Sequence, residues 1–173
     1  MMVRFCFIAY HFFIFSKKTR NEQTNNNLGI YNRIYLISDI DISSFDALAI
    51  PGGFEVYGFY NDAYDDKFLD LIRGFKANNK FIASICVGAL PLGKSGVLKD
   101  KKGTTYNSAV RRKALQGFGV NVINQPIVID DNMITSWNPS TAVDVALLLL
   151  EHLTTKNNAD KVRQLLGFDD KKN

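Results

Sequence analysis

Residues 80–96 read KFIASICVGALPLGKSG, and they carry the strongest signal for the fold. A short apolar run, Phe81–Ile85, stops at Cys86, and a glycine-containing segment with the apolar spacing of a helix follows at once. An apolar strand, one nucleophile-type residue, and then glycine and a helix form the pattern of a nucleophile elbow. Such an elbow is a sharp turn that raises one side chain from the carboxyl edge of a sheet. The stretch therefore predicts a strand, an elbow at Cys86 and a helix.

The predicted elbow makes Cys86 a candidate nucleophile or oxidation sensor. The unpaired N–H groups at the start of the following helix would lie beside its sulfur, which favours the thiolate over the thiol. The alternative interpretation is that Cys86 is a small buried residue at a strand end, which is common for cysteine. The local pattern does not decide between these two roles.

The segments before the elbow alternate between strand and helix. Ala47–Ile50 is a continuous apolar run closed by Pro51-Gly52-Gly53, as expected for a strand buried on both faces of a parallel sheet. Residues 65–79 are expected to form a helix, because their apolar side chains fall on one face. Strand, helix, strand and helix in this order predict an α/β fold with a mostly parallel sheet.

The rest of the chain is assigned from the same signals. We expect strand or strand-plus-turn structure in residues 1–15, an exposed loop at 16–27, a β-rich segment at 33–37 and a loop at 54–62. After the elbow we expect an extended piece at 103–106, a basic helix at 108–116 with Ser108 as its N-cap, and strands at 120–123, 127–129 and 133–136. A long helix at 140–153 should turn Val143, Ala146, Leu147 and Leu150 to the core, and a tail helix should follow around 159–166.

Composition limits the classes of function. The 173 residues are 46% hydrophobic and 22% charged, which predicts one globular domain over residues 1–173. The net charge of +4 is spread in short pairs without interleaved aromatic residues, so we expect a solvated surface and no nucleic-acid partner. The apolar start is too short to span a bilayer and has no small-residue cleavage site, so we expect no membrane partner and a cytoplasmic protein.

Cysteine and histidine usage argues against a metal or cofactor. Cys6 and Cys86 are the only cysteines, and we expect free thiols rather than a disulfide. The only histidines are His11 and His152, so no metal-ligand cluster is visible. His11 is interpreted as a packed or edge residue rather than a base for Cys86, and His152 as structural.

Five short stretches resemble the ThiJ/PfpI family in order and spacing: residues 45–53 (FDALAIPGG), 82–89 (IASICVGA), 96–99 (GVLK), 104–106 (TTY) and 134–136 (ITS). That family belongs to the class I glutamine amidotransferase-like superfamily, together with the parkinsonism-associated deglycase. The resemblance covers roughly residues 31–153. It implies a flavodoxin-like three-layer sandwich with a mostly parallel sheet, Cys86 as the reactive centre, a link to stress responses and a homodimer.

The resemblance also implies an oxyanion hole. Glycines let backbone N–H groups approach a substrate oxygen, so Gly52 and Gly53 would act together with the N–H of Val87 beside Cys86. Glu55 and Tyr106 are candidate site-lining residues. A tight turn that ends the strand is an alternative role for the two glycines, and both roles can hold together.

Three departures from the family limit the activity that can be carried over. Some members have a histidine directly after the nucleophile, where Val87 stands here. Others have one on the strand after the basic helix, but residues 119–124 (GVNVIN) contain none, so cysteine-protease chemistry is not expected. Residues 1–15 contain no early acid. The opening strand–helix unit looks shortened or replaced, with 12–16 matching the family's second strand, and Glu55 is the nearest acidic substitute although surface solvation is its favoured role.

Three functions follow from these residues. In the first, Cys86 adds to a small electrophile such as an α-oxoaldehyde, an amide or an isonitrile, as a hydratase, hydrolase or glyoxalase-like enzyme. Residues 86–98 most resemble the isonitrile-hydratase branch, although that branch has Thr after the cysteine and an early Asp. In the second, Cys86 serves a redox sensor or stress-associated binding protein. In the third, the chain is an inactive shortened family member.

Overall fold

The computed structural model describes residues 5–9, 13–15 and 36–168. A six-stranded sheet in the order β2-β1-β3-β4-β8-β7 forms its centre. Strands β1, β3, β4 and β8 are mutually parallel, and β2 and β7 are antiparallel edge strands. The bounds are β1 Phe5–Ala9, β2 Phe13–Phe15, β3 Ala47–Ile50, β4 Phe81–Ile85, β7 Ile127–Asp130 and β8 Met133–Ser136. A separate parallel pair joins β5 (Lys102–Gly103) to β6 (Asn121–Val122).

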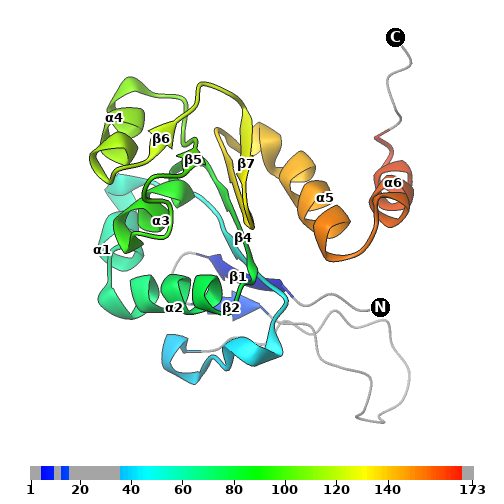
Figure 1. Cartoon of the computed structure of the whole chain (residues 1–173), viewed down its shortest axis with the longest axis horizontal. Coiled ribbons are helices and arrows are strands. Elements are labelled where there is room, and N and C mark those ends of the chain that lie inside the picture. The colour runs from blue at the N-terminus through cyan, green and yellow to red at the C-terminus, as the bar shows by residue number, and fades with distance from the viewer. Residues whose placement is uncertain (1–4, 10–12, 16–35, 169–173) are drawn as a thin grey trace.

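Helices cover both faces of the sheet, as Figure 1 shows. On one side lie α1 (Phe59–Ala63), α2 (Asp66–Ala77), α3 (Ala89–Ser95) and α4 (Ala109–Gly117). On the other side lies α5 (Ala142–Leu153), with α6 (Lys156–Leu165) packed against it. The predicted three-layer α/β sandwich is confirmed, and the order β2-β1-β3-β4 is that of flavodoxin-like folds.

The two faces of the central strands carry two separate cores. Leu48 of β3 and Ile82 of β4 belong to the cluster under α2 and α3, whereas Ala47 and Ala83 belong to the cluster under α5. Side chains alternate between the two faces of a strand, so both sets are buried only where helices cover both faces. The continuous apolar runs that predicted doubly buried strands are therefore explained.

The chain opens with two antiparallel strands. Residues 10–12 alone separate β1 from β2, and Ile8 pairs with Ile14. A parallel crossover needs a dozen or more residues, so a helix does not fit between these strands. The expected strand structure in residues 1–15 is confirmed for β1 and β2. The expected loop at 16–27 lies outside the described residues.

Three assignments need correction. Leu36 and Ile37 do not continue a strand, because Ile37–Asp39 is a 3-10 turn; residues 33–35 lie outside the described part. Residues 54–62 are not a plain loop, since they contain the turn Glu55–Tyr57 and the start of α1. Ser108 does occupy the N-cap of α4, but its side chain makes no capping hydrogen bond.

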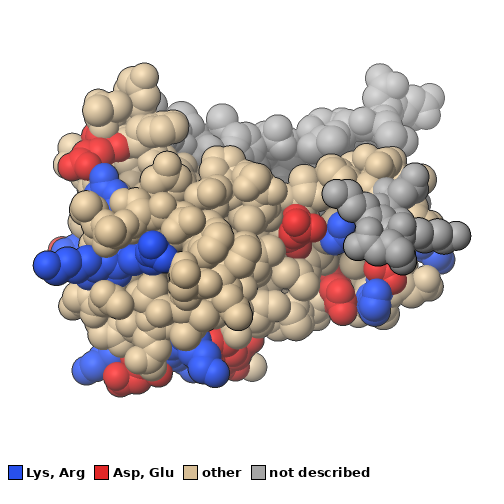
Figure 2. Space-filling model, turned by 90° about the horizontal axis from the view of Figure 1, so that it is seen from above, with Lys and Arg blue, Asp and Glu red and all other residues tan. Residues whose placement is uncertain are grey.

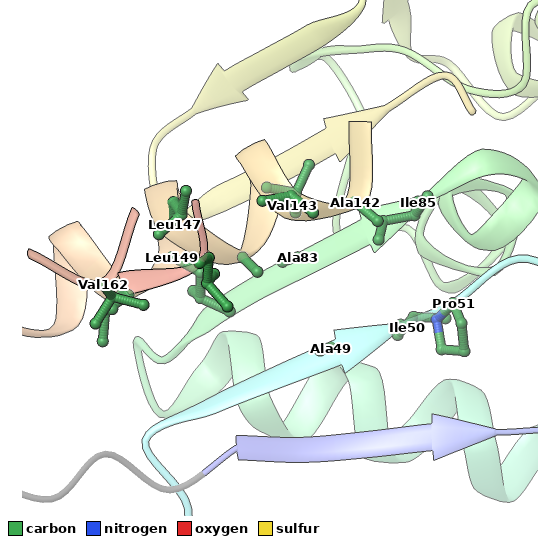
Figure 3. Close-up of a pocket in the computed structure, with 14 residues that line it drawn as sticks. Ala49, Ile50, Pro51, Ala83, Ile85, Ala142, Val143, Leu147, Leu149 and Val162 are labelled. Atoms are coloured by element: carbon green, nitrogen blue, oxygen red, sulfur yellow. The ribbon is translucent and has the colours of Figure 1, made fainter. Parts of the chain in front are cut away.

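The apolar face of α5 also differs from the prediction. Val145, Leu147 and Leu149 are its buried residues, whereas Ala146 is exposed and Val143 and Leu150 are only partly buried. Val143, Ala146 and Leu150 line an apolar groove of about 390 Å³. This groove lies between α5, α6 and the ends of β3 and β4 (Figure 3). Within the described ranges, no helix combines the length and apolarity needed to cross a bilayer.

Charged side chains are distributed unevenly over the surface. On the face shown in Figure 2, Lys and Arg side chains form a short row at one end, and most of the middle of the face is uncharged. Acidic side chains lie near the basic ones at both ends of this face. The expected absence of a nucleic-acid partner stays a prediction.

Candidate functional site

Cys86 lies on a sharp elbow between a strand and a helix. Strand β4 ends at Ile85, Cys86 has a φ of 61°, and a 3-10 turn (Cys86–Gly88) leads directly into α3. A residue other than glycine in this left-handed region costs about 1–2 kcal/mol, so surrounding contacts must hold it there. The Cys86 carbonyl oxygen accepts hydrogen bonds from the Thr105 hydroxyl at 3.0 Å and the Tyr106 backbone N–H at 3.2 Å.

Two glycines allow the end of β3 to approach the elbow closely. A Cβ atom on Gly52 would lie 2.6 Å from Cys86 Cβ and 3.0 Å from Cys86 Sγ. A Cβ atom on Gly88 would lie 2.7 Å from the carbonyl oxygen of Ile50 and 2.9 Å from that of Pro51. These separations are shorter than real side-chain contacts, so only glycine fits at either position without a shift.

One backbone donor and one glycine lie beside the sulfur. The N–H of Val87 hydrogen-bonds to the Cys86 side chain. The N–H groups of Gly52 and Gly53 have no acceptor among the described residues, and Gly52 itself packs against the sulfur. The oxyanion hole expected from Gly52, Gly53 and Val87 stays a prediction.

The electrostatic environment of Cys86 differs from the prediction. Burial raises the pKa of the Cys86 thiol above its ordinary value, and the Val87 N–H and the charge of Arg111 lower it only in part. Helix α3 has seven residues, so the dipole behind the elbow is short. The expectation that the elbow favours the thiolate is wrong in its net direction, because loss of solvation outweighs the favourable contacts.

Glu55 lies beside Arg111 rather than at the sulfur. Its carboxylate oxygen Oε2 is 2.7 Å from Arg111 Nη2, and the Arg111 guanidinium lies 5.0 Å from the centre of the Tyr60 ring. Burial raises the pKa of Tyr60, and the nearby Glu55 and Cys86 raise it further while Arg111 lowers it. Glu55 is therefore linked to the site by its ion pair with Arg111. Tyr106 contacts the elbow through its backbone, and 43% of its surface is exposed.

Sequence reasoning missed Thr105, Arg111 and Tyr60. Thr105 was part of a recognised stretch, but nothing marked its hydroxyl as an anchor for the elbow. Arg111 was assigned to a basic helix, and the contact of its side chain with the Tyr60 ring is a tertiary contact between α4 and α1. The spacing of residues along the chain carried no signal for that contact.

The described histidine is remote from Cys86. His152 stacks on Phe81, with 5.0 Å between the ring centres. Phe81 begins β4, whereas Cys86 follows the last residue of β4. His152 and Cys86 therefore lie at opposite ends of this strand. His11 lies outside the described residues. In the described ranges no three metal-ligating side chains are grouped.

Comparison with known proteins identifies the family. Residues 21–152 match the DJ-1/PfpI family, and the chain belongs to it. The match includes β3, the elbow at Cys86 and the hairpin of β7 and β8. The family assignment made from short stretches of sequence is confirmed.

Individual relatives are similar at moderate identity. The isonitrile hydratase of Pseudomonas putida is 29% identical over 128 residues, covering 74% of this chain and 54% of the relative. The glutathione-independent glyoxalase DJ-1 of Schizosaccharomyces pombe is 36% identical over 94 residues, covering 54% of this chain and 48% of the relative. A ThiJ/PfpI family protein from Pseudomonas syringae superimposes with a TM-score of 0.70 at 28% identity, covering 81% of this chain and 56% of that one. The chain spans about half the length of the two curated relatives.

Proposed function

We propose that this protein uses Cys86 as a nucleophile toward a small electrophilic metabolite, as a hydratase, hydrolase or glyoxalase-like enzyme. One observation carries the proposal: the backbone of Gly52 packs directly on the sulfur of a residue held in the left-handed region at a strand–helix elbow. A strained backbone at a functional position persists only when the surrounding structure enforces it. The names of the hydratase and glyoxalase relatives support small electrophiles as the substrate class.

The first chemical step uses the thiolate. For an amide, a sulfur electron pair forms a bond to the carbonyl carbon while the C=O π pair moves to oxygen. We assign donation to that oxyanion to the N–H groups of Gly53 and Val87, with Gly52 beside the sulfur. Collapse of the adduct expels the amine, which takes a proton from solvent. Attack of water on the thioester then releases the acid and restores the thiol.

We assign proton transfer in this site to solvent, because the described residues supply no base beside Cys86. Among the described residues no histidine lies near Cys86, and Glu55 is paired with Arg111. A cysteine-protease mechanism, which needs a Cys–His pair, is therefore not proposed. In this proposal the thiol loses its proton to water, and its raised pKa makes that loss unfavourable at neutral pH.

Turnover should rise steeply with pH. Because the pKa of Cys86 is raised, the reactive thiolate is scarce at neutral pH and increases about tenfold per pH unit until the pKa is passed. The test is kcat/KM against pH for an α-oxoaldehyde, an isonitrile and a carboxamide. At least one should be turned over, with activity still increasing above the pH at which an ordinary thiol is half ionised. A flat profile would contradict thiolate chemistry.

A redox role is the second candidate, because Cys86 is a free and partly exposed thiol. Oxidation to a sulfenic acid needs no base or acid partner, but it also depends on the thiolate. Selective oxidation of Cys86 over Cys6 at low peroxide, without turnover of any substrate class, would favour this role. The homodimer expected from the family resemblance stays a prediction.

A further inference from the structure

Arg111 places a positive charge beside the Cys86 site. We propose that Arg111 recognises the carboxylate of an anionic substrate, so that the preferred electrophile carries a carboxylate next to its reacting carbon. This inference rests on the proposed function, because it concerns the same cysteine. It adds a charge requirement that neither the elbow nor the oxyanion donors impose.

Two contacts hold the Arg111 guanidinium in a fixed orientation. Glu55 accepts from Nη2 at 2.7 Å, and the guanidinium lies over the face of the Tyr60 ring. Among the described residues, Nε and Nη1 of Arg111 have no acceptor. A planar guanidinium with unused donors binds a carboxylate through parallel hydrogen bonds. The side chain is 28% exposed, so it is partly open to solvent.

Arg111 and Cys86 share one local environment. Tyr106, whose backbone N–H donates to the Cys86 carbonyl oxygen, precedes the first turn of the helix that carries Arg111. Glu55, the ion-pair partner of Arg111, follows closely on Gly52, which packs against the Cys86 sulfur. Both contacts place Arg111 near the elbow. Glu55 is the nearby negative charge, and its side chain is 67% exposed. A substrate carboxylate would therefore meet the oriented guanidinium of Arg111. Glu55, the carboxylate that already pairs with Arg111, is largely exposed to solvent.

The neighbouring arginine provides a matched control. Arg112 lies on the same helix and carries the same charge, but its guanidinium donates to the side-chain oxygen of Asn124. Consecutive helical residues point about 100° apart, so the two arginines face different surroundings. Arg112 has no contact with the Glu55–Tyr60 cluster among the described residues.

The test compares alkylation of Cys86 by iodoacetate and by iodoacetamide. In both reactions the thiolate displaces iodide and forms a new S–C bond, and the reagents differ only in carrying a carboxylate or a neutral amide. The rate ratio cancels the thiolate fraction, so it reports recognition of charge rather than a change in pKa. Peptide mass spectrometry separates modification of Cys86 from that of Cys6.

Arg111→Gln should lower the iodoacetate-to-iodoacetamide ratio by about tenfold, the effect of losing one charged hydrogen-bonding partner. Arg112→Gln should change the ratio by less than about twofold, although it removes the same net charge. Glu55→Gln should raise the ratio, because the competing carboxylate is removed. If Arg111→Gln does not fold, as judged by circular dichroism, the Glu55→Gln variant carries the test.

The outcomes separate the two proposals. An unchanged ratio in Arg111→Gln, an equal fall in Arg112→Gln, or no rise in Glu55→Gln overturns carboxylate recognition. In those cases normal alkylation of Cys86 by iodoacetamide leaves the proposed function standing. If native Cys86 reacts with neither reagent even at alkaline pH, both proposals fail.

Discussion

Replacing Cys86 with serine lowers turnover on the order of 10³-fold or more, the loss expected when a nucleophile is removed. A serine hydroxyl does not ionise in the pH range in which a thiol does. Among the described residues, no histidine lies near position 86 to activate the hydroxyl. The fold should persist, because serine is close to cysteine in shape and Cys86 is partly exposed. The measurement is kcat/KM for the best substrate, alongside a thermal unfolding curve.

The matched control is the same substitution at the other cysteine. Cys6→Ser should retain turnover, because the proposal assigns all chemistry to Cys86. Turnover in Cys86→Ser above about a tenth of the wild-type value would show that another group is the nucleophile. An equal loss in both variants, with both folded, would also contradict the assignment.

Gly88→Ala should reduce the free energy of unfolding by about 1–3 kcal/mol, the usual cost of overpacking. The backbone at Gly88 has φ −60° and ψ −17°, which alanine adopts readily, so the effect is steric. The added methyl group would meet the carbonyl oxygens of Ile50 and Pro51, and backbone atoms yield less easily than side-chain ends. Displacing the end of β3 also moves Gly52 from Cys86, so turnover should fall together with stability.

Gly117→Ala is the control for that prediction. Gly117 is the last residue of α4, and a Cβ atom there would meet nothing within 4 Å. Alanine favours the helix over glycine, so this variant should be neutral or more stable by up to about 1 kcal/mol. Urea unfolding of both variants tests the pair. Equal free energies of unfolding for Gly88→Ala and Gly117→Ala would contradict the close packing of Gly88 against the end of β3.

The sequence predicted the central strands well, because Ala47–Ile50 and Phe81–Ile85 are apolar runs bounded by turn residues. It predicted α5 but not its buried face. Residues 147–150 are four consecutive leucines, so helical periodicity could not select which side meets the sheet. The helix α1 was missed because residues 54–62 are rich in aromatic and turn-forming residues, and its packing against α2 is a tertiary effect.

The local part of the site was also predictable. An elbow at Cys86 and glycines at 52 and 53 follow from short motifs with defined backbone requirements. The pKa of the thiol was not predictable, because burial depends on how the whole chain packs around the sulfur. The contact of Arg111 with Glu55 joins residues 56 positions apart, which no motif indicates.

The most direct test of the central claim is the pH dependence of Cys86 alkylation by iodoacetamide, in a Cys6→Ser chain so that one thiol reports. We predict that native Cys86 reacts with an apparent pKa above the ordinary thiol value of about 8.5, and that unfolding in urea returns the pKa to that value. A native chain that stays unmodified at alkaline pH, while the unfolded chain reacts fully, would contradict the claim that Cys86 is an accessible reactive centre.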